Sequence, residues 1–446
     1  MRGRLLGCCF LCVGFTFIRA GVCQDDSALL GGSATVNSVG PHAYELMSPA
    51  ITAIDALIRH DAGETGFRRD FSRVKIGGKI RLGPTFNAVS CVRCHGGNGR
   101  GALRVGSGPL GSDTVVKVSL PGGHGASHGG PAPVPGIGLQ IRDHATHGNN
   151  KEGRVAIHWL PVLGAYDDGT KYELREPRVI IRGLPKRSPR RFQTSLRRAP
   201  PVIGQGLIDA IPAQSIEANA DPSDADGDGI SGRVNTVWDV QARSFSVGRF
   251  GFKAGSPSLK QQIAAAYATD MGVTNPLFRL RGERPEISSR ILEATTFYAA
   301  TLGVPMARDQ TLAAVTHGRE LFNSLGCAHC HVATFVTDGG ADSSLANQII
   351  HPFSDFLLHD MGVGLSDNRS EFAASGEEWR TTPLWGIGLT EDVLNGQLAT
   401  YLHDGRARSL EEAILWHGGE ASAARSQFTA LQASERDSLI QFLRSL

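Results

Sequence analysis

The sequence predicts a mainly α-helical protein with few strands and long, loop-rich insertions. Apolar residues at helical spacing run from Gly318 to Leu325 and stop at Gly326, a residue typical of a helix C-terminus. Residues 434–446 carry a second apolar stripe, and residues 409–418 begin with a capping box. Few segments alternate with a period of two, and the 55 glycines gather in loops, many of them in the 200 or so residues between the helical parts.

The most informative pattern is C-x-x-C-H, the attachment signal of c-type haem, which occurs twice: Cys91-Val-Arg-Cys94-His95 and Cys327-Ala-His-Cys330-His331. The two thiols each form a thioether to a haem vinyl group, and the histidine reaches the iron. A thioredoxin-like pair would not need the histidine, and paired zinc motifs stand only about 15–20 residues apart. The sequence therefore predicts two covalently bound haem c groups in two cytochrome c-like helical haem domains.

We divide the chain into three parts. Residues 1–23 are a signal peptide, 24–300 an N-terminal cytochrome c-like haem domain with a long insertion, and 301–446 a C-terminal cytochrome c domain. Arg2 and Arg4 precede an apolar stretch that is too short to span a bilayer, as in an export signal. We expect a periplasmic or secreted protein; a lipoprotein is the alternative.

The cysteine count, the net charge and the apolar runs of the sequence argue against several classes of site and partner. Four of the eight cysteines lie in the leader and the haem motifs use the other four, so no pair is left for a disulfide. The net charge of +2 does not favour a nucleic-acid partner. No other apolar run is long enough for a transmembrane helix.

Several further motifs accompany the haem motifs. They are Gly83-Pro-Thr-Phe-Asn87, Asn98-Gly-Arg-Gly101, Gly206-Leu-Ile-Asp-Ala-Ile-Pro212, the Asp-rich segment 221–233, Gly248-Arg-Phe-Gly-Phe-Lys-Ala254, Leu402-His-Asp-Gly-Arg-Ala407 and His417-Gly-Gly-Glu-Ala421. With them, most of the mature chain resembles the bacterial dihaem oxidoreductases often labelled thiol oxidoreductases, which are related to dihaem cytochrome c peroxidases. The resemblance implies a peroxidase-like haem enzyme, whereas the cysteine count gives no support to thiol chemistry.

His417 is the candidate sixth ligand of the second haem. In dihaem peroxidases a residue at a similar distance after an H-[DS]-G motif supplies this ligand, usually Met, and the resemblance places His417 there. The alternative is a histidine that binds carbonyls at a helix C-terminus. His403 is expected beside the haem or at an interface, and His329 at the surface.

The sixth position of the first haem has no clear candidate. His124, His128, His144 and His147 are in range, but residues 122–130 indicate a flexible surface loop. An open iron could bind peroxide, and a nearby acid would then move a proton during O–O cleavage. Asp209 is the candidate acid, although the resemblance favours Glu there; a helix-cap or salt-bridging Asp is the alternative.

The Asp-rich segment has the spacing of a calcium loop. Asp224, Asp226 and Asp228 occupy positions 1, 3 and 5, and Ile230 offers its carbonyl. Asn235 stands at position 12, where the bidentate Glu is missing. We expect a structural calcium ion; the alternative is a turn without metal.

Two further groups of residues are considered for electron transfer. A basic stretch is usually a solvated face, but it could dock an acidic donor or neutralise haem propionates. It contains Arg182, Lys186, Arg187, Arg190, Arg191, Arg197 and Arg198. Trp238, Phe252 and Trp385 are the aromatic residues to inspect between the haems, with a core role expected for each.

Together these features predict an exported dihaem c-type oxidoreductase, in which electrons pass through the C-terminal haem to a reactive N-terminal haem. The expected partners are peroxide and a redox protein such as a small cytochrome or a cupredoxin. The alternative function is a dihaem electron carrier without an open catalytic iron.

Overall fold

The structure is a computed structural model that describes residues 28–76, 79–102, 106–111, 113–122, 127–280, 282–340, 342 and 344–446. The expected signal peptide and His124 lie outside the described residues.

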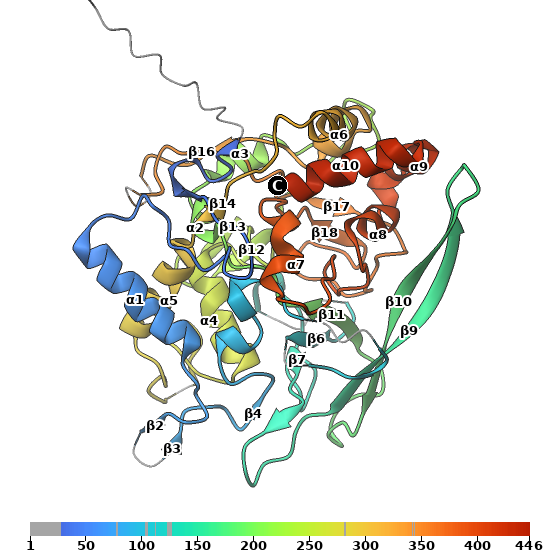
Figure 1. Ribbon diagram of the computed structural model, residues 1–446. Helices are drawn as coiled ribbons and strands as arrows, with labels where there is room; N and C mark the ends of the chain where they lie inside the picture. The colour runs from blue at the N-terminus through green and yellow to red at the C-terminus, as the bar shows by residue number, and fades with distance from the viewer. Residues whose placement is uncertain are drawn as a thin grey trace, which may run out of the picture.

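The helices fall into two groups along the chain (Figure 1). The group before residue 301 comprises α1 (Ile54–Arg68), α2 (Gln205–Asp209), α3 (Ala213–Glu217), α4 (Leu259–Asp270) and α5 (Ser289–Ala300). The later group comprises α6 (Ala313–Ser324), α7 (Thr390–Val393), α8 (Leu410–Leu415), α9 (Ser422–Ala430) and α10 (Ala433–Ser445). Short 3₁₀ helices are η2 (Gly32–Ala34), η3 (Cys91–Arg93), η4 (Gly96–Asn98), η5 (Ser127–Gly129), η6 (Cys327–His329), η7 (Ile387–Leu389) and η8 (Gly419–Ala421).

The strands form small sheets. Two of these have three strands: β5 (Gly108–Pro109), β9 (Arg154–Ala165) and β10 (Lys171–Arg182) in one, and β6 (Thr114–Ser119), β7 (Gln140–Ile141) and β11 (Gln193–Arg198) in the other. The two-stranded pairs are β1 (Thr35–Val36) with β14 (Val304–Pro305), β2 (Lys75–Ile76) with β3 (Lys79–Ile80), β4 (Thr85–Phe86) with β8 (His144–Ala145), β12 (Thr236–Asp239) with β13 (Ser244–Val247), β15 (Phe335–Val336) with β16 (Ile349–Ile350), and β17 (Leu358–Asp360) with β18 (Glu378–Arg380).

The prediction of a mainly α-helical fold with few strands is wrong. The structure is 28% helical and 20% strand. The longest strands, β9 and β10, form an antiparallel hairpin that extends from the body of the molecule (Figure 1). Many residues of this hairpin are only partly buried, and a run such as Trp159-Leu-Pro-Val-Leu163 does not alternate between apolar and polar residues as a half-buried strand does. The Asp168-Gly169 turn, with Gly169 at φ +87°, was the available signal.

The helices of the C-terminal part agree better with the prediction than the strands do. α6 and α10 match the two apolar stripes, and Gly326 has φ +83° directly after α6. α8 begins after Ser409, whose side chain accepts a hydrogen bond from the Glu412 N–H. α8 ends at Leu415, earlier than the expected Gly418.

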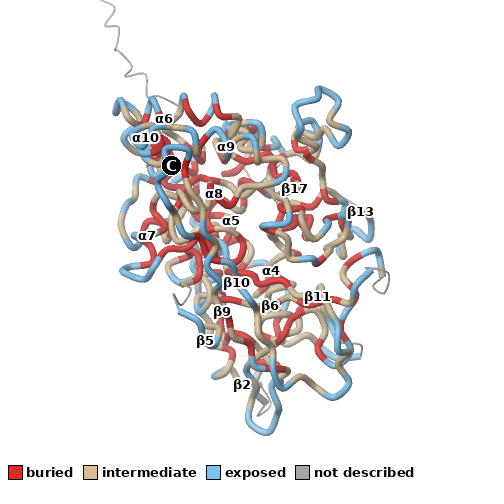
Figure 2. Tube along the Cα trace, turned by 90° about the vertical axis from the view of Figure 1, so that its right-hand side faces the viewer, coloured by how far each residue is buried: buried red, intermediate tan, exposed pale blue. Residues whose placement is uncertain are grey.

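Each of the two helical groups contains a close helix crossing. α1 packs on α5, and α6 packs on α10. A Cβ on Gly318 would lie 2.0 Å from the carbonyl oxygen of Ser438, so only glycine permits the second crossing. Buried positions follow these contacts through the interior, and exposed ones gather in outer loops (Figure 2).

The start of the described chain contacts the region near residue 300. β1 pairs in parallel with β14, with Thr35 opposite Val304. The domain boundary at residue 300 stays a prediction. Within the residues described, no helix combines the length and apolar character needed to cross a membrane.

Candidate haem sites

The second C-x-x-C-H motif begins where α6 ends. Gly326 turns the chain into η6, which carries Cys327, and His331 follows. The Nδ1 of His331 lies 2.9 Å from the carbonyl oxygen of Phe353, to which it donates a hydrogen bond as neutral imidazole. Burial lowers the pKa of His331 to about 4. The ring is therefore neutral at pH 7 and leaves Nε2 for a metal.

His417 is placed in a matching way after α8. Its Nδ1 lies 2.7 Å from the carbonyl oxygen of Ala413, and burial lowers its pKa. The ring thus satisfies a helix carbonyl through one nitrogen and keeps Nε2 for another partner. His417 and His331 line the same cavity of about 380 Å³, together with both cysteines of the second motif.

A buried charged group forms another part of this cavity wall. His359 lies between Asp355 (2.8 Å from Nε2) and Glu420 (2.6 Å from Nδ1), and its Nδ1 is 3.6 Å from the sulfur of Cys330. Burial alone would lower the pKa of His359, but its hydrogen bonds with Asp355, Cys330 and Glu420 raise it to about 12.

The Asp-rich loop borders the same cavity. Carboxylate oxygens of Asp224, Asp226 and Asp228 all lie within 4.8 Å of one another. Asp228 and Ile230 line the cavity, and Asp228 lies 3.4 Å from His329, which is exposed as expected.

Asn235 has other partners. It is fully buried, donates to the carbonyls of Lys253 and Glu371, and accepts from the Ala373 N–H. These contacts join two loops, and they give Asn235 a structural role.

The first motif lies on η3. The Nδ1 of His95 is 2.7 Å from the carbonyl oxygen of Pro200, and burial lowers the pKa of His95. Cys94, but not His95, lines a smaller cavity of about 280 Å³ with Arg100 and Asn395. We call this the first cavity, and the cavity of His331 and His417 the second cavity. His95 therefore has the same arrangement as His331: Nδ1 is held by a carbonyl and Nε2 remains for a metal.

The other described histidines that we considered as ligands of the first haem have different surroundings. His128 stacks on Trp238 with ring centroids 3.6 Å apart, and His144 bonds Asp143 at 2.8 Å. Neither these nor His147 line either cavity.

Asp209 lies outside both cavities. Its carboxylate accepts a hydrogen bond from the N–H of Leu259, the first residue of α4, at 3.1 Å. Burial raises the pKa of Asp209, and the nearby Arg249 opposes that effect. These contacts match the helix-cap alternative.

The aromatic residue that contacts His403 most closely is Trp379, which the sequence did not single out. Trp379, Phe252 and His403 line the second cavity, whereas Trp385 is a buried core residue.

In the basic stretch, residues 182–191 are largely exposed, but Arg197 and Arg198 are buried.

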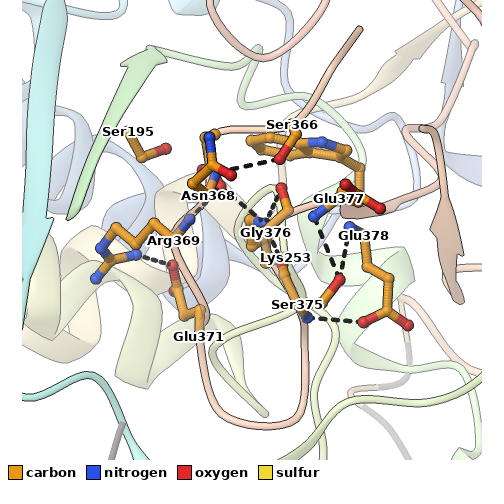
Figure 3. A network of polar contacts seen from close by, with 12 residues as sticks. Ser195, Lys253, Ser366, Asn368, Arg369, Glu371, Ser375, Gly376, Glu377 and Glu378 are labelled. Carbon is orange, nitrogen blue, oxygen red and sulfur yellow. Dashed lines mark hydrogen bonds and ion pairs between the residues drawn. The ribbon is translucent and has the colours of Figure 1, made fainter. Parts of the chain in front are cut away.

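A polar network that includes Lys253, Arg369 and Glu371 lies beside the cavity (Figure 3). Arg197 and Lys253 pair with Asp367 at 3.1 and 3.2 Å, and Arg369 pairs with Glu371 at 2.7 Å. Burial alone would raise the pKa of Glu371, but the surrounding cations lower it well below its usual value.

Comparison with known proteins identifies the family. The family model described as "Di-haem oxidoreductase, putative peroxidase" matches residues 25–282 and 281–446. The chain belongs to this family. No curated protein matches it.

Two solved structures resemble this di-haem oxidoreductase distantly. One is hydrazine synthase of Kuenenia stuttgartiensis, pressurised with 20 bar xenon (14% identity, 100% of both chains covered, TM-score 0.36). The other is a MauG-like protein associated with microbial copper homeostasis (15% identity, 55% of this chain and 90% of that one covered, TM-score 0.28). TM-scores at this level do not establish a shared fold.

The residues present fit the two haems of a di-haem oxidoreductase. Each motif holds two cysteines without a disulfide and a neutral, carbonyl-bound histidine. The larger cavity has walls rich in aliphatic and aromatic side chains, which suit a broad apolar macrocycle.

Proposed function

We propose that this di-haem oxidoreductase is an exported, peroxidase-like c-type enzyme, in which electrons pass through the C-terminal haem to a reactive N-terminal haem. The carrying observation is the asymmetry of the sites. His331 and His417 share one cavity, whereas among the described histidines considered for the first haem, His128 stacks on Trp238 and His144 bonds Asp143.

The residues that would hold the haems are those of the motifs. Cys91, Cys94, Cys327 and Cys330 would form the thioethers, and His95, His331 and His417 would ligate iron. Bound haem supplies one-electron transfer and, at an open iron, activation of peroxide.

The chain contributes orientation and a dry environment. The carbonyls of Pro200, Phe353 and Ala413 hold the three imidazoles by Nδ1, so each ring presents Nε2. Buried apolar residues around the second cavity keep water away from the His331–His417 pair.

We further propose a structural calcium ion in the Asp-rich loop, held by Asp224, Asp226, Asp228 and the Ile230 carbonyl. The gathered carboxylates and the loop's place in the wall of the second cavity support this. The ion would fix that wall beside His329.

The proposed electron donor is a small cytochrome or a cupredoxin, and the proposed oxidant is peroxide. Export to the periplasm or the exterior is supported by the leader in the sequence. Exposed basic residues such as Lys186 and Arg190 offer a docking face for an acidic donor.

An optical and EPR spectrum of the as-isolated protein, with and without peroxide, tests the proposal. We expect one low-spin haem and one high-spin haem that reacts with peroxide. Two low-spin haems that stay inert to peroxide, even after one-electron reduction, would leave the electron-carrier alternative.

A further inference from the structure

The β9–β10 hairpin connects two distant parts of the chain (Figure 1). Its root belongs to the N-terminal part: Ile157 pairs with β5 and shares a buried apolar cluster with Val116 of β6 and Leu196 of β11. Its turn, residues 166–170, instead contacts α8, α9 and α10 of the C-terminal part. The turn therefore lies on the helices around His417, the proposed sixth ligand of the second haem.

Contacts before His417 hold α8. Tyr166, which is 7% exposed, donates its hydroxyl hydrogen to the carboxylate of Glu411 at 2.6 Å. Burial, and next the bond to Glu411, raises the pKa of Tyr166 well above its usual value, so the hydroxyl keeps its proton and donates it. Arg408, one residue before the N-cap of α8, donates to the carbonyl of Glu173 in β10. The hairpin thus holds the first turn of the helix that carries the carbonyl bound by His417.

Contacts on the other side of this histidine hold α9 and α10. The backbone N–H of Asp167 donates to the carbonyl of Thr429 in α9 at 3.2 Å. Arg436 of α10 pairs with Asp168 at 3.0 Å, and its guanidinium lies over the ring of Tyr166, 3.9 Å from the centroid. The same turn is therefore attached to the chain on both sides of the proposed ligand.

We propose that the turn of the β9–β10 hairpin is a clamp that keeps His417 on the iron of the second haem, with Tyr166 as its positioning residue. A ligand at a helix end leaves the iron only when that helix end moves. Anchoring both neighbouring segments to one hairpin opposes such local opening. The bond from Tyr166 to Glu411 is charge-assisted and therefore among the stronger of these contacts. The proposal rests on the assignment of His417 as an iron ligand, and it adds that a segment of the N-terminal part controls how readily the second iron opens.

The test follows carbon monoxide binding to the fully reduced holoprotein after rapid mixing. Carbon monoxide binds the second haem only after the sixth ligand leaves, so this phase should be slow in the wild type and fast in His417→Ala. In Tyr166→Phe, the loss of one hydrogen bond to a carboxylate should accelerate the slow phase about tenfold. Glu411→Ala should have the same effect, and the double variant should add little, because both changes remove one contact.

Tyr172→Phe is the matched control. The Tyr172 ring packs on Tyr166 in the same hairpin, with centroids 5.1 Å apart, but its hydroxyl bonds no residue of α8 in the described chain. The slow phase should therefore keep its wild-type rate. Hydrogen–deuterium exchange gives a second readout. Backbone amides of residues 410–417 should exchange faster in Tyr166→Phe than in the wild type or in Tyr172→Phe, whereas those of α1 should not.

The outcomes separate the clamp from the ligand assignment. A Tyr166→Phe protein with the wild-type slow phase and wild-type exchange would overturn the clamp and leave His417 as the ligand. A carbon monoxide phase that is unchanged in His417→Ala would overturn the ligand assignment, and the clamp with it. If Tyr166→Phe does not accumulate, Asp168→Asn, at the exposed end of the turn, decides instead. It should accelerate the slow phase, and an unchanged rate would overturn the clamp.

Discussion

The imidazole of His403 stacks on the indole of Trp379, with ring centroids 3.5 Å apart and planes 11° from parallel. Lys253 and Arg197 lie over the same indole at 4.3 and 4.5 Å. Trp379 also donates Nε1–H to the carbonyl of Leu365 at 3.0 Å. One aromatic ring thus joins the wall of the second haem cavity to the cations of the neighbouring polar network.

Trp379→Phe tests the strength of this connection. Phenylalanine keeps most of the apolar contact but loses the Nε1 hydrogen bond and weakens the cation–π contacts. We expect the free energy of unfolding to fall by about 1–3 kcal/mol, measured by chemical denaturation. Trp238→Phe, in the similar stack on exposed His128, should cost less. Equal losses would show that the cations add nothing.

His417→Ala tests the second ligand set. Loss of the imidazole should convert the second haem from low spin to high spin, or to a form with a substitute ligand, in EPR and optical spectra. His329→Ala is the control, since His329 is exposed and belongs to the same motif region. An unchanged low-spin signal in His417→Ala would reject the assignment.

The calcium proposal predicts stability changes linked to the ion. Asp224→Ala and Asp226→Ala should lower the melting temperature and abolish the stabilisation that added calcium gives to the native state. Asp338→Ala, in another acidic loop, should respond to calcium as the wild type does. If elemental analysis finds no calcium and a chelator leaves the wild-type melting temperature unchanged, the loop is a turn without metal.

Predictions from local signals in the sequence held for the C-terminal helices and failed for the sheets. The C-x-x-C-H motifs, the place of His417 and the helices around Gly318 depend on short spacings that the sequence shows directly. β6, β7 and β11 depend on residues far apart in the chain: Thr114 pairs with Arg198. Such pairing leaves no short-range pattern, particularly where glycine-rich loops separate the strands.

Residues that act through long-range contacts escaped the sequence for the same reason. Arg198 stood in a basic stretch that looked solvated, yet the β11 register buries it beside Thr400. Trp379 had no motif around it. His359 could have been noticed, because Leu358-His359-Asp360 repeats the Leu402-His403-Asp404 pattern.

Asp209→Asn distinguishes a proton-transfer role from a capping role. The contact with the Leu259 N–H favours the cap, so we expect a loss of about 0.5–2 kcal/mol in unfolding free energy and little change in peroxide consumption. Ser258→Ala, at the N-cap of the same helix, should cost a similar amount. A decrease of about 10²–10⁴-fold in peroxide consumption at unchanged stability would instead establish Asp209 as the acid.

Because of His359, the free energy of unfolding should decrease as the pH rises above neutral. Its folded-state pKa of about 12 lies above the unfolded value near 6.5. The folded protein therefore keeps a proton that the unfolded chain loses. The resulting stabilisation is complete below about pH 6.5 and declines as pH rises toward 12.

Denaturation from pH 6.5 to 10 measures this effect. In the wild type, His359 should contribute a fall in unfolding free energy of about 1.4 kcal/mol per pH unit. His359→Leu should lose that slope and be about 3–5 kcal/mol less stable at neutral pH, because Asp355 and Glu420 then lack their buried partner. His42→Leu, whose side chain is 79% exposed beside Glu45, should keep the wild-type slope. A wild-type slope retained in His359→Leu would mean that another group binds the proton.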